Sequence, residues 1–170
     1  NQTSCPGLKI LMEVAGLKGP VDAYDVGFRI GPRLNAAGRL GDAQMALELL
    51  LPGAEPRLRE LAQYLDESNR ERQGIEAAMV QSAVAGFERT FDPDAMFSLV
   101  TAQPGWHAGV VGIVASRLAQ RYYRPSVVIA LEGDSGRGSC RSIEGFDLVS
   151  ALGECAEHLR KFGGHGMAAG

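Results

Sequence analysis

The sequence contains no long apolar run and few cysteines, and these absences exclude several classes of protein. No stretch is long and apolar enough to span a bilayer, and residues 1–7 lack the basic and then apolar pattern of a signal peptide. The three cysteines are Cys5, Cys140 and Cys155. They are widely spaced and form no Cys-x-x-Cys motif, which argues against a disulfide framework or a zinc site. We therefore expect a cytoplasmic protein whose cysteines are reduced thiols.

Positive charge is also in short supply. The chain has 17 Lys and Arg against 20 Asp and Glu, a net charge of −3 at pH 7. This balance argues against a protein that binds nucleic acid through an all-basic surface, so any phosphate binding must be local. The local basic groups are Arg29, Arg33 and Arg39 early in the chain, and Arg117, Arg121, Arg124, Arg137 and Arg141 later.

Hydrophobic residues make up 45% of the 170 residues and charged residues 22%, which indicates one medium globular domain or two small ones. Residues 1–52 are expected to be part of a helical domain, with short helices interrupted by glycine. Gly31 and Pro32 are expected to end one helix, and Asp42 to cap the next. That next helix is expected over residues 43–51.

Residues 55–90 have apolar side chains at helical spacing at both ends, while residues 66–73 between them are almost wholly polar. This pattern predicts one long helix that bridges two bodies across solvent. A coiled-coil arm is the alternative, but the heptads are not sustained enough to support it.

The last part of the chain, residues 91–170, alternates strand and helix signals. The order strand, helix, strand, strand, helix predicts an α/β domain with a small mixed sheet. We expect the strands at residues 97–101, 127–131 and 137–142, and the helices at residues 108–122 and 147–161. Because the chain stops where another element should cover the sheet, we expect it to be a fragment.

Residues 163–170 are Gly-Gly-His followed by small residues, and glycine lets backbone approach a ligand closely. Successive backbone N–H groups in such a segment can form an anion-binding concavity, and phosphate is the expected ligand. For Gly163 alone, the favoured interpretation is the C′ position of the preceding helix.

Two further segments suggest anion binding. Strand alternation in residues 138–142 places Ser139 and Arg141 on one face, where a hydroxyl and a guanidinium can both meet a phosphate. The alternative is that Arg141 pairs with Glu144. At residues 105–109, an anion could dock on the first turn of the following helix beside His107, and Trp106 could stack on a base. The alternatives are a packing role for Trp106 and a helix cap for His107.

Residues 31–41 combine two arginines, an asparagine and three glycines, and they are expected to form a shaped loop. Arg33 and Arg39 could contact phosphate, or they could bridge helices by capping carbonyls. Arg117, Arg121 and Arg124 are expected to line a solvated helix face.

Candidate metal ligands and nucleophiles are scarce. Asp92 and Asp94 flank a proline in a turn signal, and His158 is expected to be exposed among charged neighbours. The sequence contains no carboxylate and histidine cluster for metal-assisted hydrolysis, no P-loop, and no serine or cysteine with a convincing base.

Taken together, residues 31–41, 106–117, 138–142 and 163–170 resemble the RecJ-type single-strand-specific exonucleases of the DHH phosphoesterase family. Residues 163–170 spell the motif Gly-Gly-His-x-x-Ala-Ala-Gly in full. The resemblance implies three parts: the end of a DHH catalytic domain at residues 1–52, a long connecting helix at residues 53–90, and most of a DHH-associated substrate-binding domain at residues 91–170.

The resemblance implies an enzyme of DNA repair and recombination that degrades single-stranded DNA from the 5′ end. It implies two manganese or magnesium ions held by a catalytic domain that this chain lacks, and a helicase and a single-strand-binding protein as partners. It implies catalytic roles for Arg141 and His165, and a 5′ or scissile phosphate held by Ser139 and Arg141. The substrate-binding residues that it implies are Arg33, Asn35, Arg39, Trp106, His107, Ser139, Arg141, Ser142, Gly163, Gly164 and His165.

Two alternatives stay open at this point. One is a DHH phosphoesterase of short oligonucleotides or cyclic dinucleotides. Residues 33–41 and Trp106 favour the exonuclease over this alternative. The other is a non-catalytic single-strand-binding module. The net charge of −3 argues against this alternative. Under the exonuclease interpretation, this chain alone is expected to bind weakly and to cut nothing.

Overall fold

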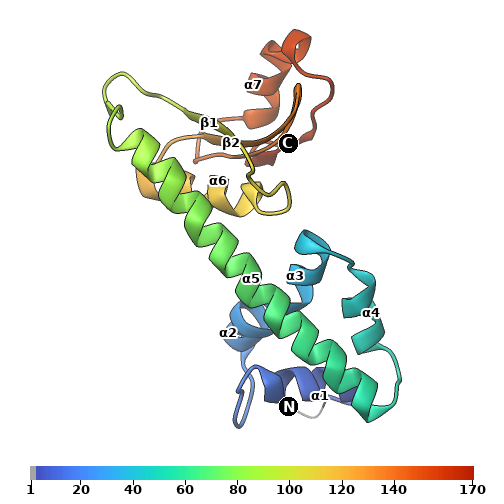
Figure 1. Cartoon of the computed structure of the whole chain (residues 1–170). Coiled ribbons are helices and arrows are strands. Elements are labelled where there is room, and N and C mark those ends of the chain that lie inside the picture. The colour runs from blue at the N-terminus through green and yellow to red at the C-terminus, as the bar shows by residue number, and fades with distance from the viewer. Residues whose placement is uncertain (1–2) are drawn as a thin grey trace. The chain divides into compact units, whose positions relative to one another are not determined.

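The computed structural model describes residues 3–170, which fold as two compact units, Asn1–Gly74 and Ile75–Gly170. The long helix α5 (Glu55–Phe87) contributes to both units (Figure 1). The prediction of one long helix is therefore confirmed. The finer division predicted from the sequence, with boundaries at residues 52 and 90, stays a prediction.

The first unit is helical. Its elements are α1 (Pro6–Val14), α2 (Ala23–Asp25), the π-helical η1 (Val26–Ile30), α3 (Gly31–Leu40), α4 (Gln44–Leu50) and the first part of α5. Leucines from three of these helices form its core, with Leu11, Leu49, Leu58, Leu61 and Leu65 all buried. A Cβ on Gly7 would collide with the Leu49 carbonyl, so glycine is required where α1 crosses α4.

The structure corrects the expectation that Gly31 and Pro32 end a helix and that a shaped loop follows. Gly31 and Pro32 lie inside a continuous helical stretch instead, where η1 passes directly into α3. The Gly31 N–H bonds back to the Val26 carbonyl, and Pro32 is in the first turn of α3, where the N–H that it lacks is tolerated. The Asp42 cap is confirmed, since its Oδ1 accepts a hydrogen bond of 2.8 Å from Gln44 N at the start of α4.

The second unit is an α/β sandwich. Its elements are the end of α5, β1 (Leu99–Pro104), α6 (Val111–Tyr122), β2 (Ser126–Glu132), β3 (Ser135–Arg141), α7 (Leu148–Glu154), the short 3-10 helix η2 (Ala156–His158), β4 (Gly164–His165) and β5 (Ala168–Ala169). The sheet order is β1-β2-β3-β5-β4, with β1 parallel to β2 and all other neighbours antiparallel. This arrangement confirms the predicted α/β class.

The helices α6 and α7 cover opposite faces of the sheet (Figure 1). Helix α6 packs on β2 and β3. On the other face, Leu148 of α7 packs against Cys140 and Ala169 in a small buried cluster. Since side chains alternate along a strand, Ser139 and Arg141 lie on the α6 face while Cys140 between them lies on the α7 face.

The expectation of a helix over residues 147–161 is wrong beyond Glu154. Leu148, Val149 and Leu152 pack on the sheet, but every residue from Gly153 to Gly164 is exposed. A short helix with no buried face is not stable in water, so the chain leaves the helix there. Gly163 is consequently not a helix cap, because the tail that contains it forms the hairpin of β4 and β5.

The polar middle of α5 is not solvated as expected. Asp66, Asn69, Arg72 and Glu76 are all buried. Arg33 reaches Asp66 within the first unit, and Arg117 reaches Glu76 within the second. Distant arginines thus pair with the two acids, while Arg72 Nη2 donates to Asn69 Oδ1 at 3.0 Å, and these contacts make the burial tolerable.

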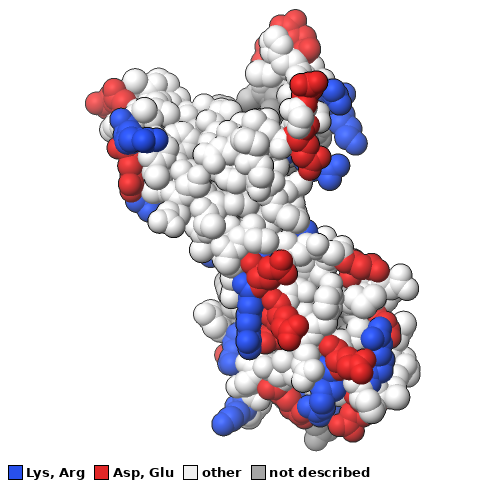
Figure 2. Space-filling view, in the orientation of Figure 1, with Lys and Arg blue, Asp and Glu red and all other residues white. Residues whose placement is uncertain are grey.

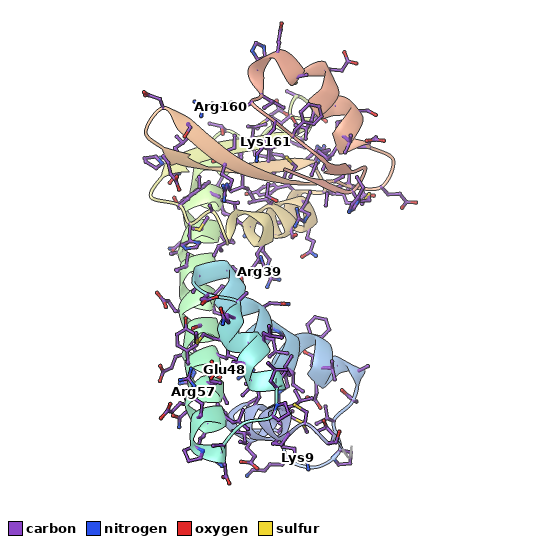
Figure 3. The ribbon with its side chains drawn as sticks, turned by 90° about the vertical axis from the view of Figure 1, so that its right-hand side faces the viewer. Lys9, Arg39, Glu48, Arg57, Arg160 and Lys161 are labelled. Carbon is purple, nitrogen blue, oxygen red and sulfur yellow. The ribbon has the colours of Figure 1, made fainter. Side chains whose placement is uncertain are left out.

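Charge on the surface is mixed. Figure 2 shows acidic and basic side chains beside one another on the visible face rather than a continuous basic area. Glu48 and Arg57 form one such pair, with a distance of 2.7 Å between Oε1 and Nε (Figure 3). None of the described helices has the length and apolar character that crossing a bilayer requires.

Candidate phosphate-binding site

Ser139 and Arg141 lie together on the α6 face of β3. Arg141 Nη1 donates hydrogen bonds to Ser139 Oγ at 3.0 Å and to the Cys140 carbonyl at 2.7 Å. The first turn of α6 approaches both side chains at Gly112. A Cβ on Gly112 would stand 3.0 Å from Ser139 Oγ and 3.1 Å from Arg141 Nη2. A hydroxyl, a guanidinium and the start of a helix therefore meet at one place.

Arg141 does not pair with Glu144, the alternative that the sequence left open. Its hydrogen bonds go to neutral acceptors, and no carboxylate within the described part of the chain forms an ion pair with it. The positive charge is therefore available to an anion. The dipole of α6, a helix of 12 residues, adds positive potential at the same place.

His165 belongs to the same face of the sheet. Arg141 is opposite Ala168 in the β3–β5 ladder, and Ala168 is opposite His165 in the β4–β5 ladder. Residues directly opposite in antiparallel strands project from one face, so these side chains form a row. His165 Nδ1 accepts a hydrogen bond of 3.3 Å from Met167 N, which leaves Nε2 as the donor of a neutral ring.

The two glycines of the tail serve the hairpin. Gly163 exchanges two backbone hydrogen bonds with Gly170, of 2.9 and 3.0 Å. Gly164 has φ of +144°, and a Cβ there would meet the Ala168 carbonyl and stand 2.6 Å from Ala169 Cα. These close contacts lie between the strands, so glycine is required here to set His165 in register.

Trp106 and His107 precede α6. The His107 carbonyl accepts hydrogen bonds from Val110 N at 2.9 Å and from Val111 N at 3.2 Å. His107 Nδ1 accepts another from Gly109 N at 3.1 Å. These bonds hold the turn that leads into α6, whose N-cap is Val110 without a side-chain cap, and Trp106 beside His107 is half-buried.

Ser142 stabilises the loop after β3. Its Oγ donates a hydrogen bond of 2.7 Å to the Phe146 carbonyl, and its N–H donates one of 2.9 Å to the Met167 carbonyl. Ser142 thus ties the end of β3 to the turn between β4 and β5. The structure brings Ser139, Arg141 and His165 onto one face, with Ser142 at its edge.

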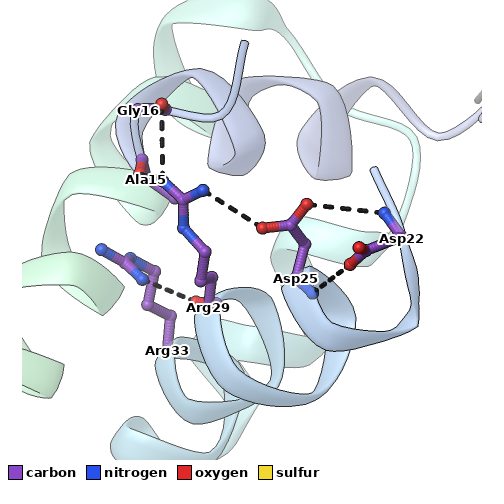
Figure 4. Close-up of polar contacts among 6 residues, drawn as sticks. All are labelled: Ala15, Gly16, Asp22, Asp25, Arg29 and Arg33. Atoms are coloured by element: carbon purple, nitrogen blue, oxygen red, sulfur yellow. Dashed lines mark hydrogen bonds and ion pairs between the residues drawn. The ribbon is translucent and has the colours of Figure 1, made fainter. Parts of the chain in front are cut away.

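The predicted residues of the first unit lie on α3. Arg33 Nη1 donates to the Arg29 carbonyl at 2.6 Å (Figure 4). Its Nε donates to Asp66 Oδ1 at 2.8 Å, so the guanidinium holds α3 against α5. Asn35 and Arg39 are exposed and four residues apart, which places them on one face of α3. Arg39 is drawn in Figure 3.

Arg117 and Arg121 of α6, and Arg124 just after the helix, are bound to neighbouring groups and do not form the freely solvated face that was expected. Arg117 Nε lies 3.0 Å from Glu76 Oε1, and Arg121 Nη2 lies 2.8 Å from Glu88 Oε1. Arg124 donates to the carbonyls of Met96 and Pro93.

Gly112 was missed by sequence reasoning. Glycine in the first turns of a helix lowers helix propensity, so its presence was a signal that something approaches closely.

On the opposite face of the sheet, burial raises the pKa of the Cys140 thiol, and the neighbouring charge of Arg141 opposes this effect. The three cysteines are free thiols.

Among residues 3–170, no group of three or more His, Cys, Asp or Glu side chains is placed to hold a metal ion. The residues present therefore do not fit a manganese or magnesium site. What the arrangement of Ser139, Arg141 and His165 can do is bind and orient an oxyanion.

The chain is similar to known proteins over nearly its whole length. The model of the DHHA1 domain matches residues 95–170. RecJ, the single-stranded-DNA-specific exonuclease of Bacillus subtilis, is 42% identical over 99% of this chain. Nearly the whole chain is therefore similar to part of a RecJ exonuclease, and residues 95–170 are similar to a DHHA1 domain. The RecJ exonucleases of Escherichia coli and Thermus thermophilus are 42% and 39% identical over 97% and 99% of the chain.

Solved structures of RecJ are similar to the chain as well. RecJ of Thermus thermophilus in complex with Mg²⁺ matches 98% of the chain with a TM-score of 0.85 at 38% identity. Exonuclease RecJ bound to manganese matches 98% with a TM-score of 0.83, also at 38% identity. The chain spans 25% and 40% of those two structures, and 22%, 30% and 24% of the three relatives named above.

Proposed function

We propose that the protein to which this chain belongs is a single-stranded-DNA-specific exonuclease that works from the 5′ end in DNA repair and recombination. The identity to RecJ exonucleases over nearly the whole chain supports the proposal. Within the proposal, this chain binds phosphate and the strand, whereas manganese or magnesium is held by residues elsewhere in the protein. A cytoplasmic location and partnership with a helicase and a single-strand-binding protein belong to the same proposal.

One observation carries the chemical part of the proposal: Arg141 lies beside Ser139 and Gly112 without a carboxylate to neutralise it within the described residues. A guanidinium binds two phosphate oxygens in a fork, and a hydroxyl donates to a third. Arg141 and Ser139 would hold the 5′ or scissile phosphate in this way. His165, whose Nε2–H is a donor, would contact the same phosphate or the next one along the strand.

Arg141 and His165 would also act during cleavage. Phosphodiester hydrolysis builds negative charge on the phosphoryl oxygens, and fixed donors that face this charge stabilise the transition state. The bound metal ions would supply the activated water. Arg33 would have a structural role instead, because its pairing with Asp66 supports α3. Asn35 and Arg39 on the exposed face of α3 would contact the DNA strand.

The experiment measures manganese-dependent degradation of 5′-labelled single-stranded DNA by this chain and by the longer protein that contains it. We expect activity only from the longer protein. Cleavage of dinucleotides but not of strands would favour the small-substrate phosphoesterase instead, and binding without cleavage of either would favour the non-catalytic module.

A variant isolates the phosphate site. Arg141→Ala should weaken binding of a 5′-phosphorylated strand by about 10- to 100-fold, the loss of charge-assisted hydrogen bonds. A 5′-hydroxyl strand should lose much less. Arg121→Ala is the matched control, because it removes one positive charge from the paired face of α6. Equal losses on both strands in the Arg141 variant would mean that Arg141 is a general backbone contact.

A further inference from the structure

A pocket of about 290 Å³ adjoins Arg141 on the α6 face of the second unit. Its walls come from α6, from the end of β3 and from the turn between β4 and β5. The residues that matter here are Ser116, Gln120, Tyr123, Arg141, Ser142 and Met167. The volume is at the lower end of the range of small-molecule sites, so the pocket suits a single small group.

The walls of the pocket are largely apolar, with Ala119, Ile143 and Met167 among them, and they contain no acidic residue. Arg141 is the only charged residue among them. Ser116 Oγ donates to the Gly112 carbonyl at 3.0 Å, which leaves its oxygen free to accept a hydrogen bond. The exposed Gln120 side chain offers both donors and an acceptor. Such a pocket suits a neutral group with an apolar body and polar edges that is attached to an anion at Arg141.

Tyr123 is the least expected residue of the pocket. It ends α6 with φ of 49° and ψ of 53°, and it is the only non-glycine residue with positive φ in the described part of the chain. Glycine or asparagine normally occupies this helix-ending position. Its neighbour Tyr122 packs its ring against Phe87 and Phe91, but Tyr123 is 60% exposed. Packing therefore does not explain the ring at position 123.

We propose that this pocket holds the nucleoside of the terminal nucleotide whose phosphate lies on Arg141 and Ser139, with its base stacked on Tyr123. The inference rests on the proposed function, which places a strand end at Arg141. Stacking is tolerant of sequence, because every base has an aromatic face. The Gln120 amide can present either its oxygen or its nitrogen, so the pocket accepts each of the four bases.

The test uses two 5′-phosphorylated oligothymidylates that carry a fluorophore at the 3′ end. In one of them, the 5′-terminal residue is abasic but keeps its phosphate. Fluorescence anisotropy gives the ratio of their dissociation constants for the 170-residue chain. We expect the abasic strand to bind about 5- to 100-fold more weakly, as the loss of one stacked base implies.

Tyr123→Gly is the informative variant, because it removes the ring and suits the positive φ of this position. It should bring the ratio close to one while the preference for a 5′-phosphate remains. Tyr123→Phe should keep the wild-type ratio. Tyr24→Ala, which removes a 64% exposed ring in the first unit, is the matched control and should also keep it.

The two proposals fail in different ways. A wild-type ratio near one, or a ratio that Tyr123→Gly leaves unchanged, overturns the nucleoside pocket and leaves the phosphate site standing. A 5′-phosphate preference that survives Arg141→Ala overturns the phosphate site instead.

Discussion

Arg141 of β3 and His165 of β4 lie in register on one face of the sheet, with only Ala168 of β5 between them. Neighbouring strands are about 4.8 Å apart, so the two backbones are separated by about 10 Å. Alanine is the small residue that leaves the space above β5 open between a guanidinium and an imidazole. From this spacing we expect room for a phosphate that both side chains reach.

Ala168→Leu should fill this space. We expect binding of a 5′-phosphorylated strand to weaken by about tenfold or more, which corresponds to the loss of one charge-assisted hydrogen bond. Ala168→Gly keeps the space and should bind as the wild type does. Anisotropy titrations measure the affinity, and thermal unfolding verifies that both variants fold. Unchanged affinity in the leucine variant would show that the phosphate does not lie between Arg141 and His165.

Gly112→Ala should separate stability from binding. Alanine raises helix propensity by up to about 1 kcal/mol, but its Cβ would stand 3.1 Å from Arg141 Nη2 and so displace the guanidinium. Affinity for the 5′-phosphorylated strand should therefore fall without loss of folding. Gly74→Ala and Gly86→Ala are matched controls, because a Cβ at either position of α5 meets nothing within 4 Å. They should stabilise the chain and leave affinity unchanged; equal affinity in all three would exclude the predicted displacement.

The features that local patterns encode were predictable from the sequence. The apolar spacing of α5 predicted one long helix, and strand alternation placed Ser139 and Arg141 on one face. Features that depend on distant partners were not predictable. Strands β4 and β5 have two residues each, too few for any periodicity, and they exist because β5 pairs with β3.

The same limit explains the polar segment of α5. Its side chains look solvated in the sequence, but Asp66 and Glu76 are buried against Arg33 and Arg117, partners that are distant in the sequence. The start of α3 was misjudged for a local reason, since Gly31 and Pro32 are compatible with either end of a helix. The apolar residues that surround them decide between the two only once the fold is known.

The ion pair between Arg33 and Asp66 should stabilise the first unit. Their side chains are 17% and 6% exposed, and Arg70 Nη2 also lies 2.6 Å from Asp66 Oδ2. Removal of one partner leaves a largely buried charge without compensation, so Asp66→Ala should lower the free energy of unfolding by about 3 kcal/mol. Urea denaturation measures this change. Glu48→Ala, which breaks the exposed pair with Arg57, is the control and should have a small effect. A comparable loss in both variants would contradict the structural role given to Arg33.

Cys140 should make stability depend on alkaline pH. Burial raises the pKa of its thiol above the ordinary value of 9.0, with the charge of Arg141 as the opposing influence. The folded state therefore retains the proton more strongly than the unfolded state. The contribution to stability is fully present below pH 9.0 and is lost as the pH rises through the raised pKa of the folded state.

The measurement compares urea denaturation of the wild type and of Cys140→Ala over this alkaline range. We expect the wild type to lose more stability between neutral and alkaline pH than the variant does, because the variant lacks the buried thiol. Cys155→Ser is the control, since Cys155 is exposed and its replacement should leave the wild-type pH dependence in place. The same contrast should appear in alkylation by iodoacetamide, with Cys155 reacting faster than Cys140 because the thiolate is the reactive form. If the wild type and Cys140→Ala follow one pH curve, the thiol does not titrate differently in the folded and unfolded states.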